Sequence, residues 1–422
     1  MKVSAIICEF NPFHSGHKYL IDTIKSSGSC VISIMSGFFV QRGDISILSK
    51  YQRAETALKN GVDLVIELPS VFSCAGAERF AKSGIAMAEK LGCVDELWFG
   101  SESGRLEQIL QAANASEDPM VLAHTKNLMK QGIYYPKALQ MSVRMFFGSE
   151  TADILNYPNN ILGIEYCKAL KGTSIMPKTT KRIGAPHDWT PDTEQENFKN
   201  NKKNGNAVTG TQSFHGSPLL GLAGSSCVSS AARIRDMIKN GDKSALQYMC
   251  GTQWPEPGET AYIERLEKVI LYKLKTMNIE DFKLLPDVSG GLEYRILKSV
   301  LKYRSVEQIL TEVKTKRYPH ARLRRMLIHS VLNITKSLQN QEVPYIRILG
   351  FNKTGGQILK KIKNKSKAFI ITKVSSGYKN LNEEARKIFD TEQLAADLFY
   401  LALDSYKVWH SEFSRAVITI DN

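Results

Sequence analysis

The sequence lacks the features that mark secreted, membrane-spanning and zinc-binding proteins. Its seven cysteines lie at wide spacings without any Cys-x-x-Cys pair, so neither a disulfide framework nor a zinc site is predicted. No run of about 18 apolar residues occurs, which leaves no candidate for a transmembrane helix. The first apolar run ends at Glu9 and is too short for the core of a signal peptide. We therefore expect a cytoplasmic protein with reduced thiols and no metal of its own.

Acidic residues are also scarce relative to basic ones. The chain of 422 residues has 56 lysines and arginines against 42 aspartates and glutamates, which gives a formal net charge of +14. This excess favours a polyanionic partner such as RNA or DNA, although many basic proteins bind no nucleic acid. Charge alone supports the two interpretations equally. The length favours two or three domains.

The first hundred residues alternate short apolar runs with helical patterns. The apolar runs cover residues 3–8, 30–35, 63–68 and 96–100, and the helical patterns between them cover 17–24, 50–60 and 75–91. This alternation predicts βαβ units, and the runs lack polar alternation, as expected of a parallel sheet covered on both faces. We therefore predict an α/β, Rossmann-like fold whose ligands bind at the carboxyl ends of the strands.

The rest of the chain is mainly helical. Helical patterns cover residues 105–170 and most of 229–339, residues 180–183 suggest a fifth strand, and residues 190–217 read as a mobile polar surface loop. Apolar runs at 345–350 and 368–374 flank a helical pattern and predict a small βαβ unit, before a long helix over 381–406. We expect an α/β domain over residues 1–240 and a mainly helical domain over 241–422.

The most distinctive motif is EFNPFHSGH at residues 9–17, where the first strand turns into the first helix. A helix N-terminus offers free backbone N–H groups to a phosphate, and Gly16 would let the phosphate approach closely. The imidazoles of His14 and His17 could donate hydrogen bonds to charge developing on a transferring nucleotidyl group. Two histidines at an ordinary helix start are the plainer interpretation, but the position after a first strand favours a phosphate site.

A second candidate anion site is SSAARIR at residues 229–235. Its hydroxyl groups could bind phosphate or cap a helix, and arginine could clamp phosphate through two hydrogen bonds. Without the first motif, an N-cap on a basic surface helix would be the preferred interpretation. Together, the two motifs resemble the HIGH-like and ISSTxIR-like motifs of the nucleotidyltransferase superfamily that is related to class I aminoacyl-tRNA synthetases.

A longer series of blocks narrows this resemblance. The blocks CEFNPFHSGHKYLI, MSGFFVQRGD, GVDLVIELP, LWFGSES, YPNNILGIEY, RIRDMI and KRYPHARLRRML follow in this order along the chain. The series is similar to the bacterial tRNA(Met) cytidine acetate ligase family over essentially the whole length. The resemblance implies that ATP activates acetate as acetyl-adenylate. The acetyl group then passes to the wobble cytidine of elongator tRNA(Met) and forms N(4)-acetylcytidine. Mg²⁺ is expected with the ATP on chemical grounds, although no set of ligands stands out, and the resemblance suggests a homodimer.

The resemblance assigns roles to residues of this chain. His14 and His17 would be catalytic and would contact the ATP phosphates. The implied ATP-binding residues are Ile7, Cys8, Glu9, Phe10, Asn11, Pro12, Phe13, His14, Ser15, Gly16, His17, Lys18, Tyr19, Leu20, Gly100, Asn159, Asn160, Arg182, Ser229, Ser230 and Arg233. Which of the two asparagines contacts ATP stays open, and Asn159 could instead cap a helix. Ala231 and Ala232 replace hydroxyl residues of many superfamily members, which removes two phosphate ligands.

Two basic segments are candidates for RNA contact. The implied tRNA-binding residues, in a segment that also holds aromatic rings, are Arg317, Arg322, Arg324 and Arg325. A second lysine-rich stretch, around residues 353–373, carries Phe351 and Phe369, but a solvated helix face is the preferred interpretation there.

Two other functions remain open. A small-molecule adenylyltransferase of cofactor metabolism would use the same motif, although it would need little of the long basic second half. A non-catalytic RNA-binding protein is opposed by the intact His14, Gly16 and His17. The base that takes up the amine proton is not identified, although Glu9, Asp44 and Glu67 fall near the expected ligand edge.

Overall fold

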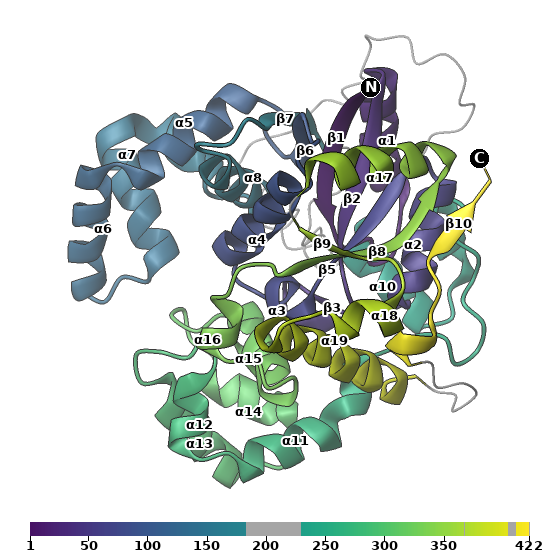
Figure 1. Ribbon diagram of the computed structural model, residues 1–422. Coiled ribbons are helices and arrows are strands. Elements are labelled where there is room, and N and C mark those ends of the chain that lie inside the picture. The colour runs from purple at the N-terminus through teal and green to yellow at the C-terminus, as the bar shows by residue number, and fades with distance from the viewer. Residues whose placement is uncertain (183–228, 367, 404–410, 422) are drawn as a thin grey trace.

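The computed structural model describes residues 1–182, 229–366, 368–403 and 411–421, so the loop expected at 190–217 lies outside the described residues. One large sheet organises the molecule (Figure 1). Its strand order is β10-β8-β5-β2-β1-β6-β7, and β9 also pairs with β8. The strands are β1 (Lys2–Cys8), β2 (Ser29–Ser36), β5 (Leu64–Leu68), β6 (Glu96–Ser101), β7 (Met176–Lys181), β8 (Tyr345–Asn352), β9 (Phe369–Ile371) and β10 (Ile418–Ile420). Strands β3 (Phe39–Val40) and β4 (Asp44–Ile45) form a separate hairpin.

The five N-terminal strands of the sheet are parallel, which confirms the predicted α/β fold. The apolar runs lack alternation because helices cover both faces, and β5 is buried at every position. The fifth strand begins four residues earlier than the sequence pattern suggests, at Met176, since it pairs with β6 along its whole length.

The small C-terminal βαβ unit is confirmed, and it extends the N-terminal sheet. Strand β8 pairs antiparallel with β5, while β9 and β10 pair parallel with β8. Without β8, the apolar β5 would be an exposed edge open to pairing with other chains. Residues 345–420 therefore complete a sheet that begins at residue 2, and the domain division at residue 240 stays a prediction.

Helices cover both faces of the sheet. One face carries α1 (Ser15–Ser26) and α2 (Lys50–Lys59), and the other carries α4 (Ala77–Lys90), α8 (Pro158–Ala169) and α17 (Lys353–Lys365). Neighbouring residues of β8 show the two sides. A Cβ on Gly350 would meet Leu58 of α2, whereas Phe351 lies beside Gly356 of α17.

The remaining helices form two further bodies (Figure 1). Helices α5 (Leu106–Glu117), α6 (Pro119–Lys130) and α7 (Tyr135–Ile154) project to one side of the sheet. Below it lie α3 (Ser70–Ser73), α11 (Glu267–Thr276), α12 (Ile279–Leu284), α13 (Leu292–Lys302), α14 (Val306–Val313), α15 (His320–Val331), α16 (Lys336–Gln339) and α19 (Glu383–Leu401). Two further helices are α10 (Ala231–Lys239) and α18 (Val374–Lys379). None of the helices in the described ranges has the length and hydrophobicity needed to cross a bilayer.

Candidate active site

A pocket opens between β1 and β6, where the order of the strands reverses. From β1 the chain adds β2 and β5 on one side and then returns to place β6 on the other. Ligands of open α/β sheets bind at such a switch point, beside the carboxyl ends of the strands. The pocket is lined by Ile6, Ile7, Cys8, Phe10, His14, Gly16, His17, Tyr19, Leu20, Trp98, Phe99, Gly100, Asn159, Leu162, Tyr166, Thr180, Lys181 and Arg182.

The two histidines of the first motif form the N-terminal cap of α1. Nδ1 of His14, the N-cap residue, accepts a hydrogen bond from Gly16 N at 3.0 Å, and Nδ1 of His17 accepts one from His14 N at 3.2 Å. A neutral imidazole whose Nδ1 accepts carries its proton on Nε2. Both rings line the pocket, so each can offer an Nε2–H donor to a ligand there.

Both imidazoles stay neutral at physiological pH. Burial lowers the pKa of His14 to about 3, and the positive charges of Arg182 and Arg235 add to the effect. Burial likewise holds the pKa of His17 well below its usual value, with contributions from His14 and Arg182. The ring centroids are 3.8 Å apart in a stacked arrangement. The pair therefore can offer two neutral donors and carries no fixed positive charge.

The backbone of this turn does not offer the free N–H groups expected from the sequence. Ser15 N donates to Tyr248 O at 3.0 Å, and the N–H groups of His17 and Lys18 donate to His14 O. Together with the two cap bonds, the N–H groups of residues 14 to 18 all have acceptors. That expectation is wrong, because the two imidazoles, the carbonyl of His14 and the carbonyl of Tyr248 together accept these hydrogen bonds, and both imidazole rings line the pocket.

Arg182 and Gly100 lie together on the opposite wall. A Cβ added to Gly100 would come within 3.0 Å of Cγ of Arg182, so the glycine leaves room for the arginine stem. Arg182 follows β7 directly and is anchored by its N–H, which donates to Ser101 O at 3.0 Å. The positive charge of Arg182 helps to lower the pKa of both histidines, and its position in the pocket wall would suit an anionic ligand.

The structure separates the roles of the neighbouring asparagines. Asn159 lines the pocket and donates through Nδ2 to Glu102 Oε1 at 2.6 Å. Asn160 is buried, and its Oδ1 accepts from Glu102 N at 2.9 Å and from Ser103 N at 3.2 Å. Asn160 thus fixes the turn after β6, whereas Asn159 faces the ligand space.

Several expected ATP contacts lie outside the pocket wall: Glu9, Asn11, Pro12, Phe13, Ser15, Lys18, Asn160, Ser229, Ser230 and Arg233. Asn11 shapes the turn through Oδ1, which accepts from Ile47 N at 2.8 Å. Ser230 is the N-cap of α10, which is the plainer interpretation of that motif. The same helix still touches the first motif, because Arg235 donates to Asn11 O at 2.8 Å.

Sequence reasoning missed seven residues of the wall: Ile6, Trp98, Phe99, Leu162, Tyr166, Thr180 and Lys181. Helical spacing could have identified two of them. Leu162 and Tyr166 follow Asn159 by three and seven positions, which places all three on one face of α8.

The four arginines expected to bind tRNA differ in availability. Arg317 and Arg324 are exposed. Arg322 donates to Asp287 O at 2.6 Å and to Ser289 Oγ at 2.9 Å. Arg325 is buried and pairs with Asp287 at 2.6 Å, and although burial opposes ionisation, this partner keeps the pKa of Asp287 below its usual value. Arg324 and Arg317 therefore remain the candidates for RNA contact, whereas Arg325 forms a buried ion pair inside the protein.

Comparison with known proteins places the chain in a family. The family model described as HIGH Nucleotidyl Transferase matches residues 1–200 and 221–412. Proteins named tRNA(Met) cytidine acetate ligase from Thermoanaerobacter sp. (strain X514) and Clostridium kluyveri (strain ATCC 8527) are 34% and 36% identical, over 100% of both chains in each case. The crystal structure of Thermotoga maritima TmcAL bound with alpha-thio ATP matches with a TM-score of 0.85 and 25% identity, also over 100% of both chains. The chain belongs to the tRNA(Met) cytidine acetate ligase family of HIGH nucleotidyl transferases.

Proposed function

We propose that the protein is an ATP-dependent acetate ligase that acetylates the wobble cytidine of elongator tRNA(Met) to N(4)-acetylcytidine. The main support for this proposal is the pair of neutral imidazole donors at the pocket between β1 and β6. The chain also matches these ligases over its full length. The solved relative that binds an ATP analogue supports ATP as the nucleotide.

In the first step, a carboxylate oxygen of acetate attacks the α-phosphorus of ATP. The new bond joins acetate oxygen to phosphorus, the bond from phosphorus to the bridging oxygen breaks, and pyrophosphate leaves. Nε2–H of His14 and of His17 would donate to phosphate oxygens as their negative charge grows, and Arg182 would balance the charge from the other wall. Since the imidazoles are neutral donors fixed by the helix cap, they need no reorganisation during the step.

The walls of the pocket differ in polarity, which suits a nucleotide. Ile7, Leu162 and Tyr166 offer apolar surface to the faces of the base and ribose, while Asn159 and Arg182 offer polar groups. We propose that Asn159 is the asparagine that contacts ATP.

In the second step, the exocyclic amine of cytidine attacks the acetyl carbon, AMP leaves, and the amine loses a proton. Acetyl-adenylate is an activated donor, so positioning of the amine supplies much of the rate. Glu67 is paired with Lys50 and Arg347 in the interior and does not line the pocket. Of the three carboxyl groups that the sequence places near this edge, Glu9 and Asp44 remain, and burial raises the pKa of each.

The remaining partners follow from the reaction. Mg²⁺ would enter on the ATP phosphates, since no group of three or more His, Cys, Asp or Glu side chains in the described ranges could hold a metal. Acetate is the acyl substrate, the reaction belongs in the cytoplasm with tRNA, and a homodimer stays a proposal from the family.

The test is acetylation of bacterial tRNA by the purified protein, using labelled acetate with and without ATP. We expect label in tRNA only with ATP, and acetate-dependent release of pyrophosphate without tRNA. If acetate drives neither reaction, the proposal is wrong. Pyrophosphate exchange driven by a phosphorylated metabolite would then establish a cofactor adenylyltransferase.

A further inference from the structure

A strongly basic part of the chain lies outside both sites described so far. Residues 343–382 contain eight lysines and Arg347 but no aspartate or glutamate. Arg347 is buried inside the sheet, whereas most of the lysines lie on the surface of α17 and the segments after it. On the sequence alone, a solvated helix face explained this stretch, but the structure shows that part of it surrounds a groove.

The groove runs between α17, the end of β9 and the chain segment that leads into β10. Its volume is about 680 Å³. It is lined by Phe351, Gly356, Leu359, Lys360, Lys363, Ile370, Thr372, Lys373, Val374, Ser375, Phe413, Ser414, Arg415, Ala416, Val417 and Thr419. Four of these side chains are cationic, none is acidic, and four carry hydroxyl groups that can bind phosphate oxygens.

The lysines of this groove have no acidic partner in the part of the chain that the structure describes. Lys360, Lys363 and Lys373 are exposed, and across the described ranges no ion pair or hydrogen bond engages their ammonium groups. They come from two elements and face one space, which concentrates positive potential there. Elsewhere on the surface lysines are often paired, as Lys82 is with Glu78 at 2.6 Å.

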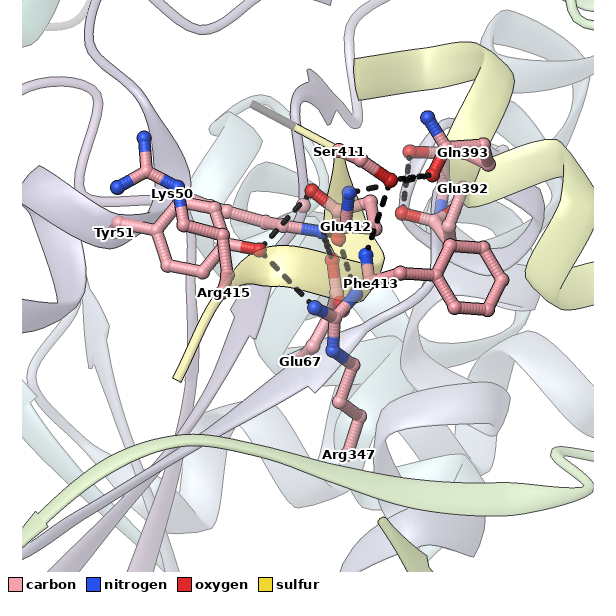
Figure 2. Close-up of polar contacts among 12 residues, drawn as sticks. Lys50, Tyr51, Glu67, Arg347, Glu392, Gln393, Ser411, Glu412, Phe413 and Arg415 are labelled. Carbon is pink, nitrogen blue, oxygen red and sulfur yellow. Dashed lines mark hydrogen bonds and ion pairs between the residues drawn. The ribbon is translucent and has the colours of Figure 1, made fainter. Parts of the chain in front are cut away.

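The far wall is fixed by a buried ionic cluster (Figure 2). Glu412 accepts from Lys50 at 2.6 Å and from Tyr51 OH at 3.0 Å, and it also pairs with Arg347. These partners lie on α2 and β8, so they anchor the C-terminal segment to the sheet.

Two neighbours of Glu412 reach the groove from this anchor. Arg415 lies over the Tyr51 ring at 4.9 Å and donates to Tyr400 OH at 3.3 Å. Phe413 leaves 40% of its surface exposed. The wall is therefore preorganised, with a cation at its inner end and an aromatic ring at its rim.

We propose that this groove, defined by Lys360, Lys363, Lys373 and Arg415, binds the phosphate backbone of tRNA. Lysine and arginine side chains along an open groove are the usual means of holding a nucleic-acid backbone, and an exposed ring offers a surface for an unpaired base. The inference rests on the proposed function for the identity of the RNA. The volume and the spread of the cations fit a polymer better than a single phosphate ion.

The same face is poorly suited to a membrane surface. Helices that lie on membranes turn an apolar face outwards, towards the lipid. In α17, Ile358 and Ile362 are buried, Leu359 is buried where it lines the groove, and the outer face is lysine-rich. An anionic bilayer would also meet a concave groove, whereas a phosphate backbone can enter it.

The groove is remote from the reacting atoms. It lies beyond β8, while the histidine pocket adjoins β1, and the strands β2 and β5 stand between them. At about 4.8 Å per strand, the lateral separation is roughly 20 Å. Bound there, the RNA would gain affinity and orientation, and adenylation of acetate would proceed without the groove.

The experiment neutralises the groove in the full-length protein with the triple variant K360Q/K363Q/K373Q. The matched control is K126Q/K130Q/K137Q, which removes the same charge from exposed positions on α6 and α7. Binding of tRNA is measured over a series of salt concentrations, and acetate-dependent pyrophosphate release is measured without tRNA. We expect the affinity of the groove variant for tRNA to fall roughly tenfold. The slope of the logarithm of its binding constant against the logarithm of the salt concentration (the salt slope) should fall in magnitude by about 2, and the control should stay near wild type.

Each other outcome has a defined meaning. If wild-type protein binds tRNA and the groove variant binds it with the same affinity and slope, the groove proposal is wrong while the ligase stands. Equal losses in groove and control variants would also overturn it, since bulk charge would then explain the effect. If wild type binds no tRNA, the proposed function fails first. If the groove variant binds tRNA like wild type but loses binding to vesicles of phosphatidylcholine and phosphatidylglycerol, the groove is a membrane site instead.

Discussion

The side chain of His17 reaches back to the backbone of His14, whose N–H donates to Nδ1 of His17 over 3.2 Å. This contact gives one imidazole two tasks, because Nδ1 completes the helix cap while Nε2–H faces the pocket. Asparagine can offer an acceptor oxygen near the position of Nδ1 but has no group near the position of Nε2. The structural and the chemical task are therefore separable by substitution.

We predict that His17→Asn lowers acetate-dependent pyrophosphate release by about 10²–10³-fold, the usual cost of removing one donor to a developing charge. His17→Ala should lose as much activity and also destabilise the protein by about 1 kcal/mol, because it removes a cap. Turnover and thermal melting of both variants measure the two effects. Near-normal turnover of His17→Asn would rule out the donor role, and identical melting curves would rule out the cap.

Acid should destabilise the protein through His14. Its pKa is about 3 in the folded chain, and an unfolded histidine has a pKa of about 6.5, so unfolding takes up a proton at any pH between these values. The contribution to stability is therefore complete above about pH 6.5 and falls as the pH drops toward 3. We predict that His14→Asn reduces this loss, measured as the free energy of unfolding against pH. An unchanged slope in the variant would contradict the low pKa.

The protonation state itself is open to direct measurement. We predict that ¹⁵N spectra of the ATP-free protein show both rings as neutral Nε2–H tautomers, without titration between about pH 5 and 8. The assignment uses His14→Asn and His17→Asn to identify the signals. A titration near pH 6.5 for either ring would mean that it reaches solvent.

The sequence was sufficient for the parts of the molecule that local patterns control. Uninterrupted apolar runs predicted the parallel strands, and the motif at residues 9–17 predicted a site at the end of β1. The sequence did not predict which donors the turn would offer. The N–H groups that a helix start usually leaves free have acceptors here, which are the two imidazoles and the carbonyl groups of His14 and Tyr248. That outcome depends on rotamers and on Tyr248, which is far away in the sequence.

Long-range pairing explains the other differences. Strand β8 joins β5 across almost 300 residues, a partnership that no local pattern encodes. The sequence pattern places Glu67 near the ligand edge and Arg325 on the RNA surface, yet both are buried, Glu67 beside Lys50 and Arg347 and Arg325 beside Asp287. A sequence shows charges one at a time and does not show which of them meet.

The neighbouring asparagines give a test of this distinction. Asn159→Ala should raise the KM for ATP several-fold with little change in melting temperature, because the side chain lines the pocket. Asn160→Ala should instead destabilise the fold by about 1–3 kcal/mol, since it leaves the partly buried N–H groups of residues 102 and 103 without their acceptor. ATP titrations and chemical unfolding of both variants decide the matter. The reverse pattern would mean that Asn160 is the ligand.

Two adjacent arginines on α15 should respond in opposite ways. Arg324 is exposed, so Arg324→Gln should weaken tRNA binding and lower its salt slope by about 1 without affecting stability or ATP affinity. Arg325 is buried against Asp287, so Arg325→Gln should destabilise the protein by about 1–3 kcal/mol, because the carboxylate loses its partner.

The decisive comparison is tRNA affinity per folded molecule, measured at a temperature where both variants of α15 remain native. Arg325→Gln should then bind tRNA like wild type, because its guanidinium already points into the protein. If Arg325→Gln loses tRNA affinity while folded and Arg324→Gln does not, α15 presents a different face to RNA than its exposure indicates. The double variant with Asp287→Asn adds a control, since removing the partner charge should restore much of the stability that Arg325→Gln loses.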